Sequence, residues 1–249
     1  MTPRETISCS GFCTRCGREH TLHAGPAHDA CRELMRALES EGRIDLHVPA
    51  AEADPRFSTD VLFSESRGHM FGVMVYRDAF GVMGTAKAFS GQYNGVWQVE
   101  GWVGPVVDVA RFDLLNTPGE RAIKAVGRRM ESLPSGTAER LELKRRRRAM
   151  SRELMEELFG LYRLTNFAGE TRPLTGVFRG EGIPTGTGDC CAPKLLHHAV
   201  TNHLTPLGLA EFYWGRENRS GSKRHGRFYP ACEEKCRPIL GFLLCGLAC

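Results

Sequence analysis

The most informative segment of this chain is Gly186-Thr-Gly-Asp-Cys-Cys-Ala-Pro-Lys-Leu-Leu196, where a glycine-rich loop turns into an apolar helix. Proline is favoured in the first turn of a helix, so Pro193 predicts a helix over about 193–203. The apolar run that follows predicts a strand at 207–214. The chain then passes through Tyr229-Pro-Ala-Cys232-Glu-Glu-Lys-Cys236 into a last helix at about 232–247. Two cysteine-bearing junctions between loop and helix therefore flank one predicted strand.

Several elements are predicted upstream of this segment. Leu34, Met35 and Leu38 share one helical face, which predicts a helix over 31–40 that ends at Gly42. Alternating apolar residues predict three strands, the first two joined in a hairpin, at 70–76, 82–89 and 96–103. The segment 118–162 has helical spacing with a break at 133–137, and it predicts a helical insertion.

The composition is that of a globular protein. Of 249 residues, 41% are hydrophobic and 25% are charged. No apolar run approaches the roughly 20 residues that a membrane span needs, and the N-terminus shows no secretion signal. We therefore expect a cytoplasmic protein with no membrane partner. Ten cysteines in such a chain favour metal or thiol chemistry over a disulfide framework.

The first cysteine cluster lies between residues 9 and 31. Cys13-x2-Cys16 places two thiolates at one tetrahedral metal ion, and Cys31 is the expected third ligand. The fourth ligand is left open among Cys9, His20, His23 and His28. Four protein ligands close a zinc site, so the sequence predicts a structural zinc knuckle here.

The second cysteine cluster lies beyond residue 189. Cys232 and Cys236 are four residues apart and share one helical face. Cys190, Cys191 or both supply the third position of a second zinc site, and His225 is a possible fourth ligand. If this site is catalytic, a carboxylate must move the proton of the metal-bound water. The first candidate for that role is Asp189 and the second is Glu211.

Two groups of cations are candidate phosphate contacts. The first is the run Lys144, Arg145, Arg146, Arg147 and Arg148. The second lies in the polar loop 216–227 and includes Arg216, Lys223 and Arg224. A solvated helix face and a flexible loop explain the same residues equally well.

The order of elements resembles the cytidine-deaminase-like fold. In that superfamily one zinc ligand begins one helix, two begin the next, and a glutamate two residues after the first ligand moves the protons. In this chain Ala192 stands at the glutamate position, and three residues separate Cys232 from Cys236. The resemblance implies an α/β, three-layer mixed-sheet domain with a helical insertion and an N-terminal zinc knuckle.

Longer motifs carry a second resemblance. They are Phe71-Gly-Val-Met-Val75, Ala88-Phe-Ser-Gly-Gln-Tyr-Asn-Gly-Val-Trp97, Gly101-Trp-Val103, Ser151-Arg-Glu-Leu-Met155, Gly186–Leu196, Ala210-Glu-Phe-Tyr-Trp-Gly215 and Phe228-Tyr-Pro-Ala-Cys232. Over residues 70–247 the chain resembles the N-terminal accessory region of some bacterial RluA-type pseudouridine synthases. The chain ends at Cys249 and contains no Arg-Leu-Asp catalytic motif, so we expect the accessory region without a synthase domain.

These observations predict a zinc knuckle and first helix at 1–40, followed by an α/β domain at 41–249 with its insertion at about 118–165. The expected function is that of a zinc-binding accessory protein of RNA modification, which binds structured RNA or an RNA-modifying enzyme. The alternative is a zinc-dependent hydrolase or deaminase that acts on a nucleobase or nucleotide. An open coordination position at the second zinc favours the alternative, and four protein ligands there favour the binding protein.

Overall fold

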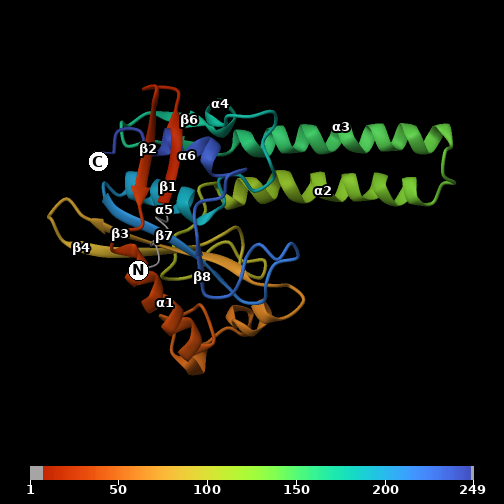
Figure 1. Ribbon diagram of the computed structural model, residues 1–249. Helices are drawn as coiled ribbons and strands as arrows, with labels where there is room; N and C mark the ends of the chain where they lie inside the picture. Colours follow the sequence, from red (N-terminus) through yellow and green to blue (C-terminus); the bar gives the residue numbers. More distant parts are fainter. Residues whose placement is uncertain (1–7, 248–249) are drawn as a thin grey trace. The chain divides into compact units, whose positions relative to one another are not determined.

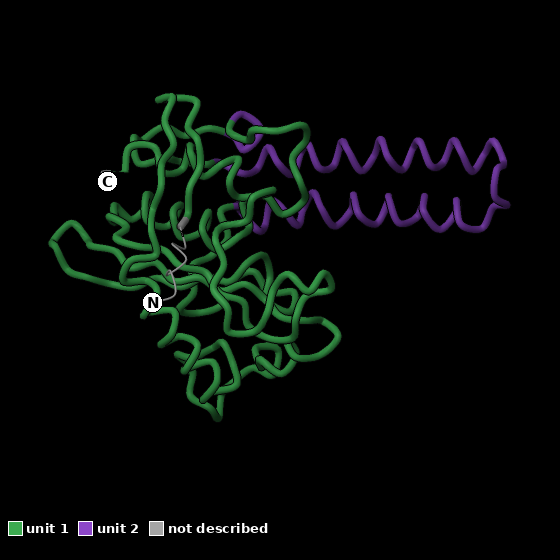
Figure 2. The backbone as a smooth tube through the Cα atoms, viewed as in Figure 1, with its two compact units in different colours: residues 1–106, 164–172, 177–249 green, residues 107–163, 173–176 purple. Residues whose placement is uncertain are grey.

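The computed structural model describes residues 8–247 and divides them into two compact units (Figure 2). Unit 1 comprises the chain up to residue 106, residues 164–172 and the chain from residue 177 onward. Unit 2 comprises residues 107–163 and 173–176. All the cysteines and histidines that are candidate metal ligands belong to unit 1.

A four-stranded sheet forms the centre of unit 1. Its order is β4-β3-β7-β8, with β4 (Met83–Phe89), β3 (His69–Arg77), β7 (Thr205–Trp214) and β8 (Arg227–Tyr229). The predicted hairpin is confirmed, since β3 and β4 pair as neighbours. All three pairings are antiparallel, so the mixed sheet expected from the sequence is wrong. The reason is that the chain returns from β7 through a loop directly to β8, without the crossover that a parallel pair requires.

The third strand expected at 96–103 is also wrong. Tyr93 and Val96 form an isolated bridge around a tight turn, and Gly95 and Gly101 have the positive φ angles of 81° and 76° that break a strand. Trp102 instead enters the core, where its Nε1–H donates to the carbonyl oxygen of Ile44 at 2.8 Å. The apolar residues of this segment therefore fill the core from a loop.

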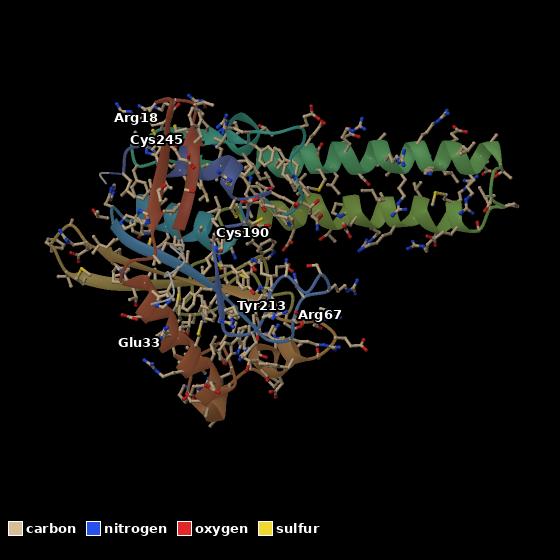
Figure 3. All side chains as sticks on the ribbon, viewed as in Figure 1. Arg18, Glu33, Arg67, Cys190, Tyr213 and Cys245 are labelled. Carbon is tan, nitrogen blue, oxygen red and sulfur yellow. The ribbon has the colours of Figure 1, made fainter. Side chains whose placement is uncertain are left out.

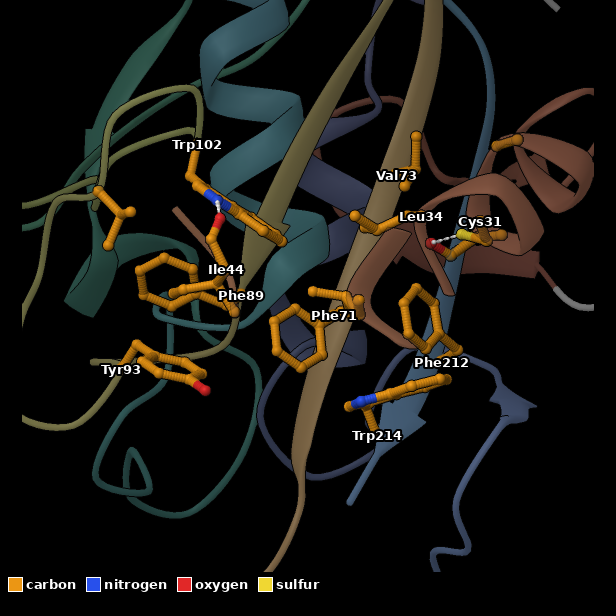
Figure 4. Close-up of a cluster of buried hydrophobic side chains, with 14 of the residues drawn as sticks. Cys31, Leu34, Ile44, Phe71, Val73, Phe89, Tyr93, Trp102, Phe212 and Trp214 are labelled. Atoms are coloured by element: carbon orange, nitrogen blue, oxygen red, sulfur yellow. Dashed lines mark hydrogen bonds between the residues drawn. The ribbon is translucent and has the colours of Figure 1, made fainter. Parts of the chain in front are cut away.

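Helices cover both faces of the sheet (Figure 1). Helix α1 (Ala27–Glu41) packs on β3 and β7 over an aromatic core that contains Phe71 and Phe212 (Figure 4). Helix α5 (Cys191–Thr201) packs on the other face. Side chains of a strand alternate between faces, so Gly72, next to Phe71, lies under α5, where an added Cβ would approach the Cβ of Cys191 to 2.8 Å.

The hairpin of β1 (Ser8–Cys13) and β2 (Arg18–His23) contacts β7 of the sheet, and α6 (Arg237–Leu243) packs on this hairpin and contacts α5. Gly11 of β1 and Gly241 of α6 lie against each other's backbone. A Cβ on Gly241 would overlap the backbone carbonyl of Phe12, so only glycine permits this crossing. Three 3-10 turns of unit 1 lie at Ala50–Glu52, Pro55–Phe57 and Asp60–Phe63. The remaining short elements are the paired β5 (Arg163–Thr165) and β6 (Thr171–Pro173), which lie mostly in unit 1, and α4 (Leu174–Val177), which lies mostly in unit 2.

Unit 2 contains two long helices, α2 (Val109–Glu131) and α3 (Ala138–Gly160), separated by the break that the sequence predicts. Asp108 and Thr137 begin them, since each side chain accepts a hydrogen bond from a backbone N–H of the first turn. Within residues 8–247 we find no helix with the length and apolar character that crossing a membrane requires.

Candidate metal centre

The turn of the β1–β2 hairpin brings Cys13 and Cys16 together. Cys13 is the last residue of β1 and pairs with Arg18, so Cys16 lies in the four-residue loop between the strands. Gly17 has a φ of 68°, and its N–H donates to the carbonyl oxygen of Cys13 at 2.9 Å. A left-handed residue at this position is suited to glycine and closes the turn. Both thiols consequently project from one tight loop.

His20 and Cys245 complete a four-residue cluster. His20 lies on β2, and its Nε2 is 3.0 Å from the Sγ of Cys16. Cys245 follows α6 at the far end of the described chain, where its carbonyl oxygen accepts the N–H of Ala168 at 3.0 Å (Figure 3). The ligand atoms of Cys13, Cys16, His20 and Cys245 all lie within 4.8 Å of one another.

The donor set of this cluster is that of a structural zinc site. Three thiols and one imidazole suit a tetrahedral zinc ion and leave no position for water. The pKa of Cys16 lies below its ordinary value: desolvation raises it, but hydrogen bonds from the backbone of Arg18 and from the thiols of Cys13 and Cys245 outweigh that effect. The pKa of Cys245 lies above its ordinary value because burial raises it, and the hydrogen bond that Arg15 donates to its Sγ at 3.5 Å opposes that rise.

The structure corrects the expected third ligand of this site. Cys31 lies inside α1 on the opposite face of the sheet, where its buried Sγ donates to the carbonyl oxygen of Ala210 at 3.3 Å. Burial raises the pKa of Cys31, as it does that of Cys9 in β1. Cys245 was not predicted because it lies 229 positions after Cys16 in the sequence. The sequence indicates only that Cys245 follows an apolar segment and belongs to neither of the two predicted ligand sets.

The second group of thiols lies where α5 and α6 begin. Cys236 is fully buried, and its pKa is raised well above the ordinary value by the neighbouring thiols of Cys190 and Cys232 and by burial. The hydrogen bond from Cys236, supported by backbone N–H groups of the same turn, lowers the pKa of Cys232 to about 5. Cys191 points away, since its Sγ donates to the carbonyl oxygen of Met70 at 3.4 Å. His225 is also occupied elsewhere, because its Nδ1 accepts the N–H of Gly215.

The two candidate carboxylates have different surroundings. Glu211 of β7 is buried beneath α5, and its Oε1 accepts the N–H of Ala192 at 2.7 Å. Burial raises the pKa of Glu211 to about 7, although the hydrogen bond from Ala192 opposes this. Asp189 is also buried, and its carbonyl oxygen accepts the N–H of Gly91. Of the two carboxylates, Glu211 is the one that contacts Ala192, the residue directly after the predicted ligands Cys190 and Cys191.

A groove of about 950 Å³ lies between α1 and the β7–β8 loop. Arginine side chains and aromatic or imidazole rings line it. The groove could not be predicted from the sequence because its walls come from three separate segments of the chain. The lining includes His23, His28, Arg32, Arg36, Trp214, His225, Arg227 and Phe228. His23, the last residue of β2, lies in this wall, so the hairpin that carries Cys13 and Cys16 contributes one side chain to the groove.

The predicted phosphate contacts fall into both units. Lys144, Arg145, Arg146, Arg147 and Arg148 are all exposed on α3 of unit 2. In unit 1, Arg216 is exposed, Lys223 lies over the ring of Tyr229 at 4.0 Å, and Arg224 pairs with Glu217 at 3.3 Å. The loop 216–227 is therefore ordered by its own contacts.

Comparison of the chain with models of protein families, with curated proteins and with solved structures finds no match.

Proposed function

We propose that this chain is a zinc-binding, RNA-associated protein of RNA modification that holds an unpaired segment of a structured RNA in the groove of unit 1. The chemistry of the groove carries this proposal. Arginine side chains recognise phosphates, and unpaired bases stack on aromatic rings and guanidinium planes. The groove offers both kinds of group in one concave surface. The resemblance to accessory regions of pseudouridine synthases supports RNA as the partner.

The rings of the groove form two close pairs, one stacked and one tilted. His28 lies on Phe228 with ring centroids 4.2 Å apart and planes 22° apart. His225 lies against Trp214 with centroids also 4.2 Å apart. Such pairs are rigid, so a base that stacks on their outer ring loses little side-chain freedom in doing so.

The cations of the groove are available to a ligand. Arg32, Arg36 and Arg227 are exposed, and none forms a salt bridge with another residue of the described range 8–247. The two acidic residues of the lining face histidines instead: Asp29 lies 3.7 Å from the ring of His28, and Glu39 acts on His225. The local field therefore favours an anion beside the arginines.

The test measures the binding of a labelled RNA hairpin with an unpaired loop by fluorescence anisotropy over a range of salt concentrations. Replacing Arg32, Arg36 and Arg227 together by glutamine should weaken binding at least tenfold. It should also lower the salt slope by about two, since each contact with a single-stranded phosphate contributes about 0.7. The matched control replaces three exposed arginines outside the groove, namely Arg77, Arg111 and Arg163.

Two results contradict the proposal. In the first, the wild-type protein fails to bind the RNA even at low salt. The groove would then be interpreted as a binding site for a protein partner. In the other, the control triple variant loses as much affinity and slope as the groove variant, which assigns the effect to net charge alone.

A further inference from the structure

The aromatic surface of the groove continues beyond the groove itself. Trp214 and His225 line the groove, and Phe63, which does not line it, contacts His225. The ring centroid of His225 lies 4.2 Å from that of Trp214 and 5.3 Å from that of Phe63. The imidazole is held in place because its Nδ1 accepts the N–H of Gly215 at 3.1 Å. Trp214, His225 and Phe63 therefore form an aromatic ladder that leads out of the groove.

Phe63 ends this ladder at the protein surface. It is 48% exposed, whereas Trp214 at the other end is 5% exposed. Phe63 is the last residue of the 3-10 turn Asp60–Phe63, which is closed by the hydrogen bond from the N–H of Ser64 to the carbonyl oxygen of Val61 at 3.2 Å. An aromatic ring that is half in water and rests on a fixed turn offers a stacking surface to a ligand.

The backbone of Arg216 is fixed beside the turn that carries Phe63. The N–H of Arg216 donates to the carbonyl oxygen of Leu62, the residue before Phe63, at 2.8 Å. The carbonyl oxygen of Arg216 accepts the N–H of Gly68 and the hydroxyl of Tyr213, both at 2.8 Å. Three hydrogen bonds therefore place the origin of one cationic side chain next to the exposed ring.

The guanidinium of Arg216 is available to an anion. Arg216 is exposed, and it forms no salt bridge with a carboxylate of the described residues 8–247. The carboxylate of the next residue, Glu217, is paired with Arg224 at 3.3 Å. A guanidinium binds phosphate through two parallel hydrogen bonds. An exposed ring and a phosphate-binding cation on neighbouring fixed backbones are the two groups that hold a nucleotide of an unpaired strand.

We propose that Phe63 and Arg216 form a second nucleotide subsite outside the groove, in which an unpaired base stacks on the ring of Phe63 and its phosphate contacts Arg216. This inference rests on the proposed function, because it extends the RNA segment that the groove holds. The rings of the ladder already contact one another, so bases stack only at its two ends. The ligand is therefore a single strand of several nucleotides, with one base in the groove and a later one on Phe63.

The subsite should accept any base. The ring of Phe63 has no hydrogen-bond donor or acceptor, so it offers only a surface for stacking, and every base has a face that stacks. The cation contacts a phosphate, which is the same in every nucleotide. The length of the unpaired strand, and not its sequence, should decide whether the subsite is used.

The experiment titrates the full chain with labelled oligouridines of increasing length and follows binding by fluorescence anisotropy. Phe63→Ala should weaken the binding of long oligomers roughly tenfold, through the loss of one stacked base, and should leave the shortest oligomers unaffected because they reach only the groove. Phe63→Leu keeps an apolar side chain against His225 and should show the same loss with the fold intact. Phe80→Ala is the matched control, since Phe80 is 92% exposed in the turn between β3 and β4.

Two further measurements locate the base and the phosphate. In Phe63→Trp a long oligomer should quench the tryptophan fluorescence more than in the wild type, whereas Phe80→Trp should respond as the wild type does. Arg216→Gln should lower the salt slope for long oligomers by about 0.7, the contribution of one phosphate contact of a single strand. Arg77→Gln removes an exposed arginine of β3 and should leave the slope unchanged.

The outcomes separate a failure of the subsite from a failure of the groove. If both Phe63 variants bind long oligomers as the wild type does, while the triple glutamine variant of the groove loses affinity, the groove binds RNA and the subsite does not exist. Equal losses for short and long oligomers mean that Phe63 acts only by positioning His225, which also overturns the subsite. If the wild type binds no oligomer of any length, the proposed function is wrong and the subsite is wrong with it.

Discussion

At the scale of single residues, the candidate metal centre includes a thiol, that of Cys245, which belongs to no local sequence motif. Cys245→Ser removes one of four ligands, so we expect a loss of about one zinc ion per chain and a lower melting temperature, because metal binding contributes to folding free energy. Cys31→Ser is the control, since a serine in α1 can still donate to Ala210. Elemental analysis of both variants checks this. Loss of zinc from Cys31→Ser alone would restore the ligand set expected from the sequence.

His69 gives the fold a dependence on pH. Its ring is buried among Phe71, Phe89 and Tyr93 and is hydrogen-bonded to the carbonyl oxygen of Ser90. Since a carbonyl only accepts, the ring nitrogen that faces it carries the proton. Burial, together with the nearby ammonium of Lys194, lowers the pKa of His69 to about 4.

The direction of the pH dependence of stability follows from the difference between the pKa of His69 in the folded chain and in the unfolded chain. The unfolded imidazole, with its ordinary pKa of 6.5, takes up a proton before the folded one does. The contribution of His69 to the free energy of unfolding is therefore complete above pH 6.5 and falls by roughly 3 kcal/mol as the pH drops to about 4. His69→Gln keeps a donor for Ser90 but does not titrate. Denaturant unfolding of the metal-loaded proteins should show the wild type losing stability relative to the variant in this window; parallel curves contradict the assignment.

At the scale of elements, local pattern predicted most of what the structure contains. The β3–β4 hairpin, the strand that became β7, α1, α5 and the two long helices follow from periodicity and from glycine and proline signals. The strand expected at 96–103 failed because apolar residues that fill a core from a loop can alternate as a strand does. The antiparallel sheet was missed because the partner of β7 depends on the return of the chain through the loop 216–226, and no local pattern encodes that return.

The candidate metal ligands also divide into a part that local pattern predicts and a part that it does not. Cys13 and Cys16 form one turn, and the hairpin register brings His20 beside them, so their association is a local property. Cys245 reaches them only because α6 crosses β1. That crossing depends on the absence of side chains at Gly11 and Gly241, and a single sequence does not reveal which glycines permit close packing.

This crossing can be tested by adding one methyl group. In Gly241→Ala the new Cβ overlaps the backbone of Phe12, so α6 must move away from β1 and carry Cys245 with it. We expect a loss of about 1–3 kcal/mol in the free energy of unfolding and faster release of the metal ion to a chelator. Gly160→Ala is the control, because no atom lies near its Cβ, and alanine there should be neutral or stabilising by up to about 1 kcal/mol. Equal behaviour of the two variants means that the contact carries no strain.

At the scale of the whole molecule, the candidate metal ligands and the exposed run of cations lie in different units. Unit 1 holds both groups of candidate metal ligands and the groove, whereas unit 2 holds the run of cations on α3. The changes in binding free energy from altering each set should add, since the two sets share no partner residue. The cations of α3 can therefore be tested without disturbing either candidate metal site.

Reversing Arg145, Arg146, Arg147 and Arg148 to glutamate should weaken RNA binding and lower its salt slope by up to about three, because each lost phosphate contact removes about 0.7 to 0.9. Zinc content should not change, because no candidate ligand lies in unit 2. The control reverses four exposed cations that are spread along α2, namely Arg111, Arg121, Lys124 and Arg128, which changes the net charge equally but creates no dense cluster. Anisotropy titrations at several salt concentrations separate the two cases. A larger loss from the α3 run identifies it as a phosphate-binding surface, whereas equal losses identify it as a solvated helix face that acts only through net charge.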